Sequence, residues 1–76
     1  MQFPSLKARR LLAILQAEPL CYRIVRQTGS HRKLEAEGYP TIKFSFHDKV
    51  EIGPTMVRRV LVDQVGLDEE TARRLI

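Results

Sequence analysis

The sequence predicts a small α+β fold in which a helix is followed by three antiparallel strands, a second helix and a short extra helix. Three observations predict it. An apolar stripe with helical spacing comes first, three short segments rich in β-forming residues follow, and a second helical stripe comes last. The strand connections are short, which favours an antiparallel meander with the helices on one of its faces. We expect residues 1–76 to form a single domain, because so short a chain buries only a thin core.

The first helix is expected to run from Pro4-Ser5 to about Ala17. Pro19 ends it, because the residue before a proline is forced out of helical geometry. The apolar positions share the i, i+3, i+4, i+7 spacing of a core-facing stripe: Ala8, Leu11, Leu12 and Leu15. The basic positions lie off that stripe and are expected in solvent: Lys7, Arg9 and Arg10.

Strands are expected at Cys21–Thr28, Ser30–Ala36 and Thr41–His47. The turn before the last of them takes Glu37-Gly38-Tyr39-Pro40. Apolar and polar residues alternate in the third strand, which is typical of a half-buried strand. Its apolar face holds Ile42, Phe44 and Phe46, and its polar face holds Thr41, Lys43, Ser45 and His47.

Gly53-Pro54-Thr55 provides start signals for the next helix, and Gly66 is expected to end it. Its apolar stripe consists of Val57, Val60, Leu61 and Val65. Asp68 is expected to cap the short last helix. That helix is expected to carry two i, i+4 ion pairs, Glu69–Arg73 and Glu70–Arg74.

Composition excludes several classes of protein. The longest apolar run, Leu11–Leu15, is far shorter than the roughly 20 residues that a membrane helix needs. One cysteine and two separated histidines show no metal-ligand spacing, so we expect neither a metal nor another cofactor. Cys21 cannot form an internal disulfide, and between Leu20 and Tyr22 it is expected to be a small buried hydrophobic residue. These features predict a cytoplasmic protein without a membrane partner.

Positive charge is concentrated in the first half of the chain. Residues 1–38 hold seven Lys or Arg and three Asp or Glu, whereas residues 39–76 hold six of each. Between Tyr22 and Lys33 there are four basic residues and no acidic one. Such a patch attracts polyanions by displacing their counterions, so a phosphate backbone is a natural partner. A merely solvated basic surface explains the charge equally well.

The second expected strand carries the residues of greatest chemical interest. Period-2 alternation places His31, Lys33 and Glu35 on one face and Arg32, Leu34 and Ala36 on the other. If Leu34 faces the helices, the His31 imidazole lies on the solvated face beside Lys33. Spacing alone favours an ordinary surface histidine over a catalytic one.

The chain resembles the HicA family of toxin–antitoxin mRNA interferases over nearly its whole length. The most specific part is Arg26-Gln27-Thr28-Gly29-Ser30-His31, since the family has a basic strand that ends in Arg-Gln-x-Gly-Ser-His. His47 lies near the position of a second family histidine. The last matching element is a helix with Arg58 or Arg59 and Leu61 before Gly66-Leu67.

This resemblance implies a fold like that of double-stranded-RNA-binding domains, ribonuclease activity on mRNA and neutralisation by a HicB-type antitoxin. It also implies that His31 is catalytic. The sequence departs from the family pattern in two places. Glu37-Gly38-Tyr39-Pro40 replaces the usual Asp-Gly-containing hairpin, and one extra residue stands between Leu61 and Gly66.

The chemistry that fits is metal-independent attack of an RNA 2′-OH on the adjacent phosphate. His31 would act as base or as acid, because an ordinary imidazole moves protons near neutral pH. Strand phase makes Lys33 the best placed of the phosphate-binding candidates and Arg32 the worst, and His47 is either an auxiliary proton-transfer group or a surface histidine. The residues expected to bind RNA are Lys7, Arg9, Arg10, Arg23, Arg26, Ser30 and Lys33.

Three other functions fit parts of the sequence. A non-catalytic RNA-binding module of the same fold would share the basic face without needing an exposed histidine beside a lysine. A DNA-binding helix-turn-helix in residues 57–76 would turn Asp68, Glu69 and Glu70 toward phosphates, which disfavours it. A structural subunit that docks a partner on its sheet is compatible with a toxin, because an antitoxin must cover some surface.

Overall fold

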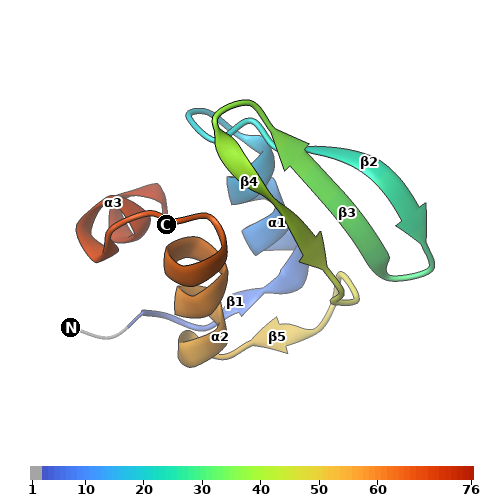
Figure 1. Ribbon diagram of the computed structural model, residues 1–76. Coiled ribbons are helices and arrows are strands. Elements are labelled where there is room, and N and C mark those ends of the chain that lie inside the picture. Colours follow the sequence, from blue (N-terminus) through green and yellow to red (C-terminus); the bar gives the residue numbers. More distant parts are fainter. Residues whose placement is uncertain (1–2) are drawn as a thin grey trace.

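The structure, a computed structural model, describes residues 3–76 and is built around a three-stranded antiparallel sheet in the order β2-β3-β4 (Figure 1). The strands are β2 (Arg23–Thr28), β3 (His31–Ala36) and β4 (Tyr39–Phe44). Gly29 and Gly38 both have positive φ, which places them in the tight turns that join these strands. The predicted meander is therefore confirmed.

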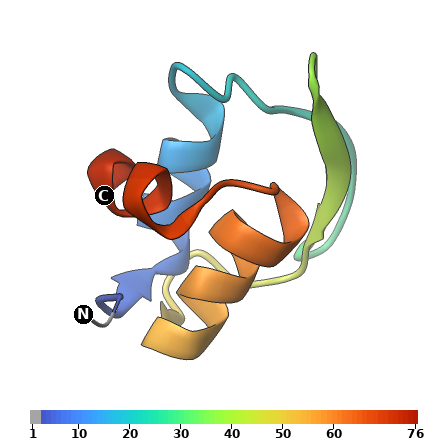
Figure 2. The same cartoon turned by 60° about the vertical axis from the view of Figure 1, so that its left-hand side comes forward.

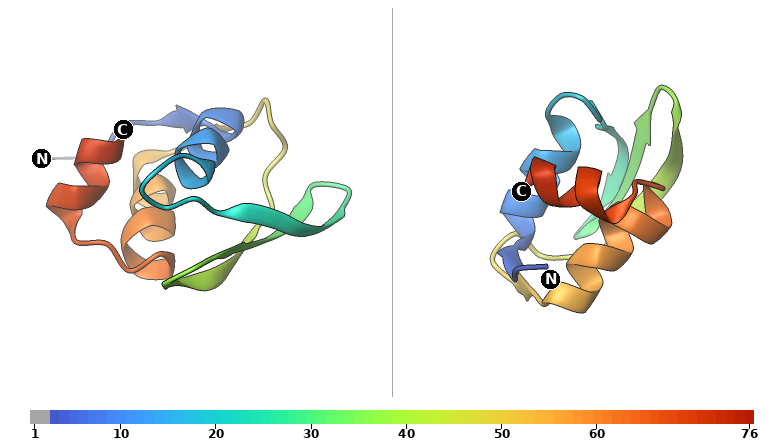
Figure 3. Two further views of the ribbon diagram at one scale, coloured as in Figure 1. Left: turned by 90° about the horizontal axis from the view of Figure 1, so that it is seen from above. Right: turned by 90° about the vertical axis from the view of Figure 1, so that its left-hand side faces the viewer.

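All helices lie on one face of this sheet (Figure 2). Two views from other sides show the same two layers, one of helices and one of strands (Figure 3). The helices are α1 (Ala8–Gln16), α2 (Pro54–Arg58), the π-helical segment η1 (Arg59–Gln64) that continues α2, and α3 (Glu69–Leu75). None of the helices in residues 3–76 has the length and apolar character needed to cross a bilayer.

The core fills the space between the two layers. Side chains that point inward from β3 and β4 meet apolar residues of α1 and of the α2–η1 helix. The largest fully buried side chains are Phe44, Leu11, Leu15, Leu20, Leu34, Leu61 and Val57. Since alternate strand residues point to opposite faces, burial of Leu34, Ile42 and Phe44 turns their neighbours toward solvent.

The first helix starts at Ala8, later than the predicted start at Pro4-Ser5. Leu6–Lys7 form a short strand, β1, which pairs antiparallel with β5 (Glu51–Ile52). The first helical N–H groups, of Ala8 and Arg9, donate to the carbonyls of Val50 (2.8 Å) and Asp48 (3.1 Å). Backbone carbonyls of the segment between β4 and β5 thus cap α1 in place of a side chain. Ala8, Leu11 and Leu15 are buried as predicted, whereas Leu12 is half-buried and Ile14 is also buried.

Several strand boundaries differ from the prediction, since β2 begins at Arg23 rather than Cys21, β3 begins at His31 rather than Ser30, and β4 differs at both ends. β4 begins at Tyr39, so the turn is confined to Glu37-Gly38, and Pro40 is tolerated because β4 is an edge strand. β4 also ends at Phe44 rather than His47, because the chain there leaves the sheet and turns toward β5. Phe46 still packs edge-on against Phe44, with 5.2 Å between ring centroids.

The prediction that Cys21 is buried is wrong. Its neighbours Leu20 and Tyr22 enter the core, whereas Cys21 lies in a turn with a φ of 55° and is exposed. Its backbone N–H donates to the Ala17 carbonyl at 2.9 Å, which fixes the turn after α1.

The helix widens to π-helical geometry in η1, within the region where the family resemblance predicts one extra residue. The Val65 N–H donates to the carbonyl of Val60, five residues back, at 3.0 Å. A turn widened in this way absorbs one residue while the flanking side chains keep their face. Val57, Val60, Leu61 and Val65 are accordingly all buried, as the stripe predicted, and Gly66 ends the helix with a φ of 92°.

The last helix forms as predicted. Asp68 caps it by accepting the Thr71 backbone N–H at 2.8 Å, and this hydrogen bond holds the pKa of the Asp68 carboxyl below its usual range. Glu69 pairs with Arg73 at 3.4 Å, and Glu70 pairs with Arg74. Arg58 also binds Glu69, at 2.9 Å, which joins α3 to α2 and lowers the pKa of Glu69.

Candidate active site

The candidate site lies on the face of the sheet that is turned away from the helices. In β3, Leu34 is fully buried against the helices, whereas His31 and Lys33 are exposed on the opposite face. The predicted phase of this strand is therefore confirmed. Cross-strand pairing decides which side chains of β2 and β4 join them.

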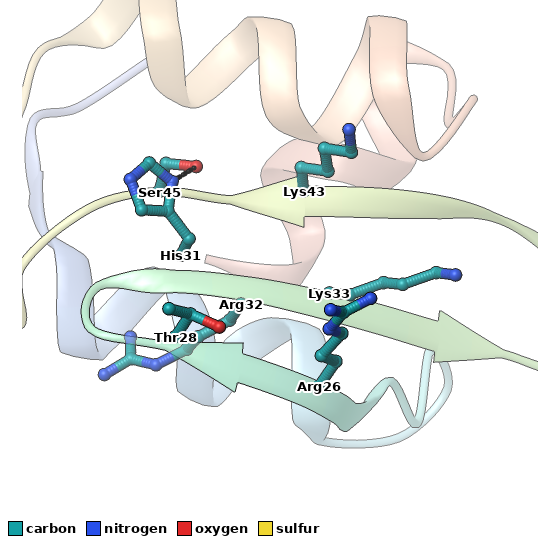
Figure 4. A pocket seen from close by; sticks show the side chains of 7 residues that line it. All are labelled: Arg26, Thr28, His31, Arg32, Lys33, Lys43 and Ser45. Atoms are coloured by element: carbon teal, nitrogen blue, oxygen red, sulfur yellow. Dashed lines mark hydrogen bonds between the residues drawn. The ribbon is translucent and has the colours of Figure 1, made fainter.

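Two rows of side chains cross the sheet on this face. In one row, Thr28 pairs with His31, and the pairing of Arg32 with Phe44 brings Ser45 beside His31. In the other row, Lys33 pairs with Arg26 on one side and with Lys43 on the other. With Arg32 these six residues line an open hollow of about 410 Å³ (Figure 4).

Within residues 3–76, the His31 imidazole makes one side-chain hydrogen bond. Its Nδ1 atom lies 3.1 Å from the Oγ atom of Ser45, and both residues are exposed (Figure 4). The ring is therefore held by one nitrogen, while the rest of it remains accessible from the hollow.

The cation row, defined as Arg26, Lys33 and Lys43, concentrates positive charge next to His31. Like charges placed directly opposite each other destabilise a sheet. Among residues 3–76, the one ion pair made by these cations is long, with 3.9 Å between Lys33 Nζ and Glu35 Oε2. No aspartate or glutamate lines the hollow. A bound anion would therefore relieve repulsion that the protein leaves uncompensated.

A family profile described as the HicA toxin of bacterial toxin–antitoxin systems matches residues 8–67. The chain belongs to the HicA toxin family. No significant match was found to a curated protein or to a solved structure.

Membership in the HicA family assigns the chain the toxin role in a toxin–antitoxin pair, with an antitoxin as the implied partner. The helix, three-stranded meander and helix agree with the predicted fold, like that of double-stranded-RNA-binding domains. The match includes every residue of the hollow and ends before α3.

Arg32 differs from the cation row of this HicA-family chain in its burial and in its close ion pair. Its side chain is 11% exposed, and Nη2 lies 2.8 Å from Asp48 Oδ1. The Nε and Nη1 atoms are buried and have no hydrogen-bond partner in residues 3–76. Arg32 therefore ties the segment after β4 to β3 through Asp48, although it also borders the hollow.

The second histidine does not share the hollow with His31. His47 lines a neighbouring hollow of about 420 Å³ with Ser30, Arg32, Asp48, Lys49 and Gly29. Ser30 is half-buried in the turn that precedes β3. The structure thus places Ser30 and His47 at the margin of the candidate site, in the neighbouring hollow.

The other predicted RNA-binding residues lie outside the hollow. Lys7 belongs to β1, and Arg9 and Arg10 are exposed on α1, in the helical layer. Arg23 opens β2 opposite Glu35. Of the seven residues expected to bind RNA, Arg26 and Lys33 are the two that join His31.

Sequence reasoning missed Thr28, Lys43 and Ser45 as members of the site. The alternation of the third strand did place Lys43 and Ser45 on its polar face. Joining them to His31 requires the register of β3 against β4, which the sequence does not reveal. Across residues 3–76, no three His, Cys, Asp or Glu side chains come together as a metal site would require.

Proposed function

We propose that this HicA-family toxin is a metal-independent endoribonuclease that cleaves mRNA, with His31 as its catalytic residue. One observation carries the proposal: the accessible His31 imidazole shares a hollow with four cations, which are the cation row and Arg32, and with no carboxylate. A polyanion is favoured there, and a proton-transfer group is in place beside it.

The reaction is a transfer within the RNA chain. The 2′ oxygen attacks the adjacent phosphorus, so an O2′–P bond forms while the P–O5′ bond breaks. His31 accepts the proton of the 2′-OH, and a proton from the same ring goes to the leaving 5′ oxygen. The products are a 2′,3′-cyclic phosphate and a free 5′-OH. DNA lacks the attacking group, so the activity is restricted to RNA.

The cation row binds the phosphate groups next to the reacting one. Two residues along a strand span about 6.6 Å, which is the offset between the His31 row and the cation row. Lys33 lies in the middle of its row and offsets charge that grows on the phosphate during attack. Lys43 joins Arg26 and Lys33 as an RNA-binding residue. Ser30 and Arg23 would extend the track along the sheet, and Lys7, Arg9 and Arg10 would extend it over the helical layer.

The partner that fits this function is a HicB-type antitoxin, and the compartment is the cytoplasm, where mRNA is the substrate. We assign the activity to one domain formed by residues 1–76.

The test is incubation of the protein with a long single-stranded RNA in EDTA, beside the His31→Ala variant. The wild type is expected to cut the RNA, whereas His31→Ala cuts it about 10²- to 10⁴-fold more slowly and still binds it. Cutting by His31→Ala at the wild-type rate would contradict the assignment. Loss of wild-type cutting in EDTA would contradict metal independence.

The His47→Ala variant, run in parallel, separates the roles of the two histidines. A loss confined to His31→Ala assigns both proton transfers to His31, whereas a comparable loss in His47→Ala assigns the second transfer to His47. RNA that is bound but cut by neither the wild type nor the variants would favour a non-catalytic RNA-binding module instead.

A further inference from the structure

We propose that Ser45 is a positioning residue that fixes the tautomer of His31. In this proposal the His31 Nδ1–H donates to Ser45 Oγ, so Nε2 is the nitrogen that exchanges a proton with RNA. The inference rests on the proposed ribonuclease function and adds the atom that performs its proton transfer.

The backbone places Ser45 firmly beside His31. Phe44, the last residue of β4, is 1% exposed and pairs across the sheet with Arg32. Phe46 is half-buried and packs on the Phe44 ring. Because residues on both sides of Ser45 point inward, the serine side chain points into the hollow. There its hydroxyl lies 3.1 Å from His31 Nδ1.

The protonation states through which the His31 ring passes favour one direction for this hydrogen bond. A neutral imidazole has one nitrogen that donates and one that accepts, whereas the protonated ring donates from both. A serine hydroxyl can pair with Nδ1 in either neutral tautomer. When the ring takes up a proton, the bond survives without rearrangement only if Ser45 Oγ is already the acceptor.

The composition of the hollow is compatible with the same direction. If Ser45 Oγ accepts from His31, the serine proton needs another acceptor. No carboxylate lines the hollow, and the neighbouring row consists of cations. Solvent accepts that proton from the exposed hydroxyl in RNA-free protein, and a phosphate oxygen of bound RNA can replace it while Ser45 keeps the orientation that leaves His31 Nε2 free.

The first test reads the tautomer in RNA-free protein from the ¹⁵N chemical shifts of the histidine rings, recorded where the rings are neutral. His31 is expected to be protonated mainly at Nδ1 in the wild type. Ser45→Ala is expected to shift the population toward Nε2–H, and Ser45→Thr, which keeps the hydroxyl, to restore it. A wild-type His31 protonated mainly at Nε2, or a tautomer that is unchanged in Ser45→Ala, would overturn the proposal.

Thr28→Val is the matched control. It removes a hydroxyl from the other side of His31 in the same row, where the structure shows no hydrogen bond to the ring from Thr28. The His31 tautomer is expected to stay as in the wild type. Amide spectra of all the variants show whether the sheet is intact, and the His47 ring provides an internal reference.

The second test is kinetic. Ser45→Ala is expected to lower kcat about two- to tenfold with little change in KM, the usual weight of one hydrogen bond. Ser45→Thr is expected to recover most of kcat. An unchanged kcat in Ser45→Ala would overturn the positioning role. If His31→Ala cleaves RNA at the wild-type rate, the catalytic assignment of His31 fails, whereas the tautomer measurement tests the Ser45 contact independently.

Discussion

Removing the cation row tests how RNA is held on the sheet. The change is the triple variant Arg26→Ala, Lys33→Ala and Lys43→Ala, whose side chains line the hollow and make no close ion pair within residues 3–76. Each contact between a cation and a single-stranded phosphate contributes about 0.7 to the slope of log K against log salt. Loss of three contacts is therefore expected to reduce that slope by about 2.

The slope converts into a measurable difference in affinity. Between about 50 and 200 mM salt, the protein with the intact row is expected to lose about 18-fold more affinity than the triple variant does. The assay is fluorescence anisotropy of a labelled single-stranded RNA at several salt concentrations. All proteins carry His31→Ala, so that the RNA stays whole.

A second triple variant of equal charge tests whether the RNA track extends beyond the sheet. Lys7→Ala, Arg9→Ala and Arg10→Ala removes the same net charge from the helical layer. If RNA is held by the hollow alone, this variant keeps the slope of the intact protein. An equal decrease in both variants would extend the RNA track over α1, as the sequence predicted. An unchanged slope in the sheet variant would refute the reasoning about the cation row.

Two further predictions concern stability. Tyr22→Phe removes the hydrogen bond that the buried phenol donates to the Pro40 carbonyl at 2.7 Å. The free energy of unfolding, measured by urea titration, is therefore expected to fall by about 1 kcal/mol. An unchanged urea midpoint would mean that this hydrogen bond contributes nothing to stability. Asp68 has a lowered pKa in the folded state, so its stabilisation is present at neutral pH and is lost as pH falls through that lowered pKa. Asp68→Asn keeps a capping side chain that does not titrate. The melting temperature of this variant is therefore expected to decline less on acidification than that of the wild type. Equal declines would contradict the contribution of the ionised Asp68 cap to stability.

The sequence predicted the parts of the fold that depend on local signals. The apolar stripe around Leu11 and Leu15, the Pro54 start and the Asp68 cap each act within a few residues, and the structure contains all of them. The pairing of Leu6–Lys7 with Glu51–Ile52 escaped prediction, because it joins segments far apart in the sequence. Leu6 and Lys7 fit a helical pattern equally well, and only the tertiary fold decides between the two.

The candidate site likewise has features that local sequence signals predict and features that depend on the tertiary fold. The exposure of His31 and Lys33 follows from the alternation around Leu34 and was predicted. The contacts with Lys43 and Ser45 depend on how β3 aligns with β4, and two residues that are polar in sequence become neighbours only through that register. The family resemblance pointed to His31 because its motif is contiguous. It carried no signal for residues that join the site across strands.

The alternation of β3 makes correct folding and the candidate chemistry depend on a single alignment. A slip of one residue between β3 and its neighbours would turn Lys33 toward the core and Leu34 into water, and would carry His31 away from Ser45. Irregularities in pairing near Ile24–Arg26 and Leu34–Ala36 mark fixed points that such a slip would have to move. A molecule in the wrong register would therefore be unstable and would also lack the assembled candidate site. Errors in folding would yield chains without the proposed activity.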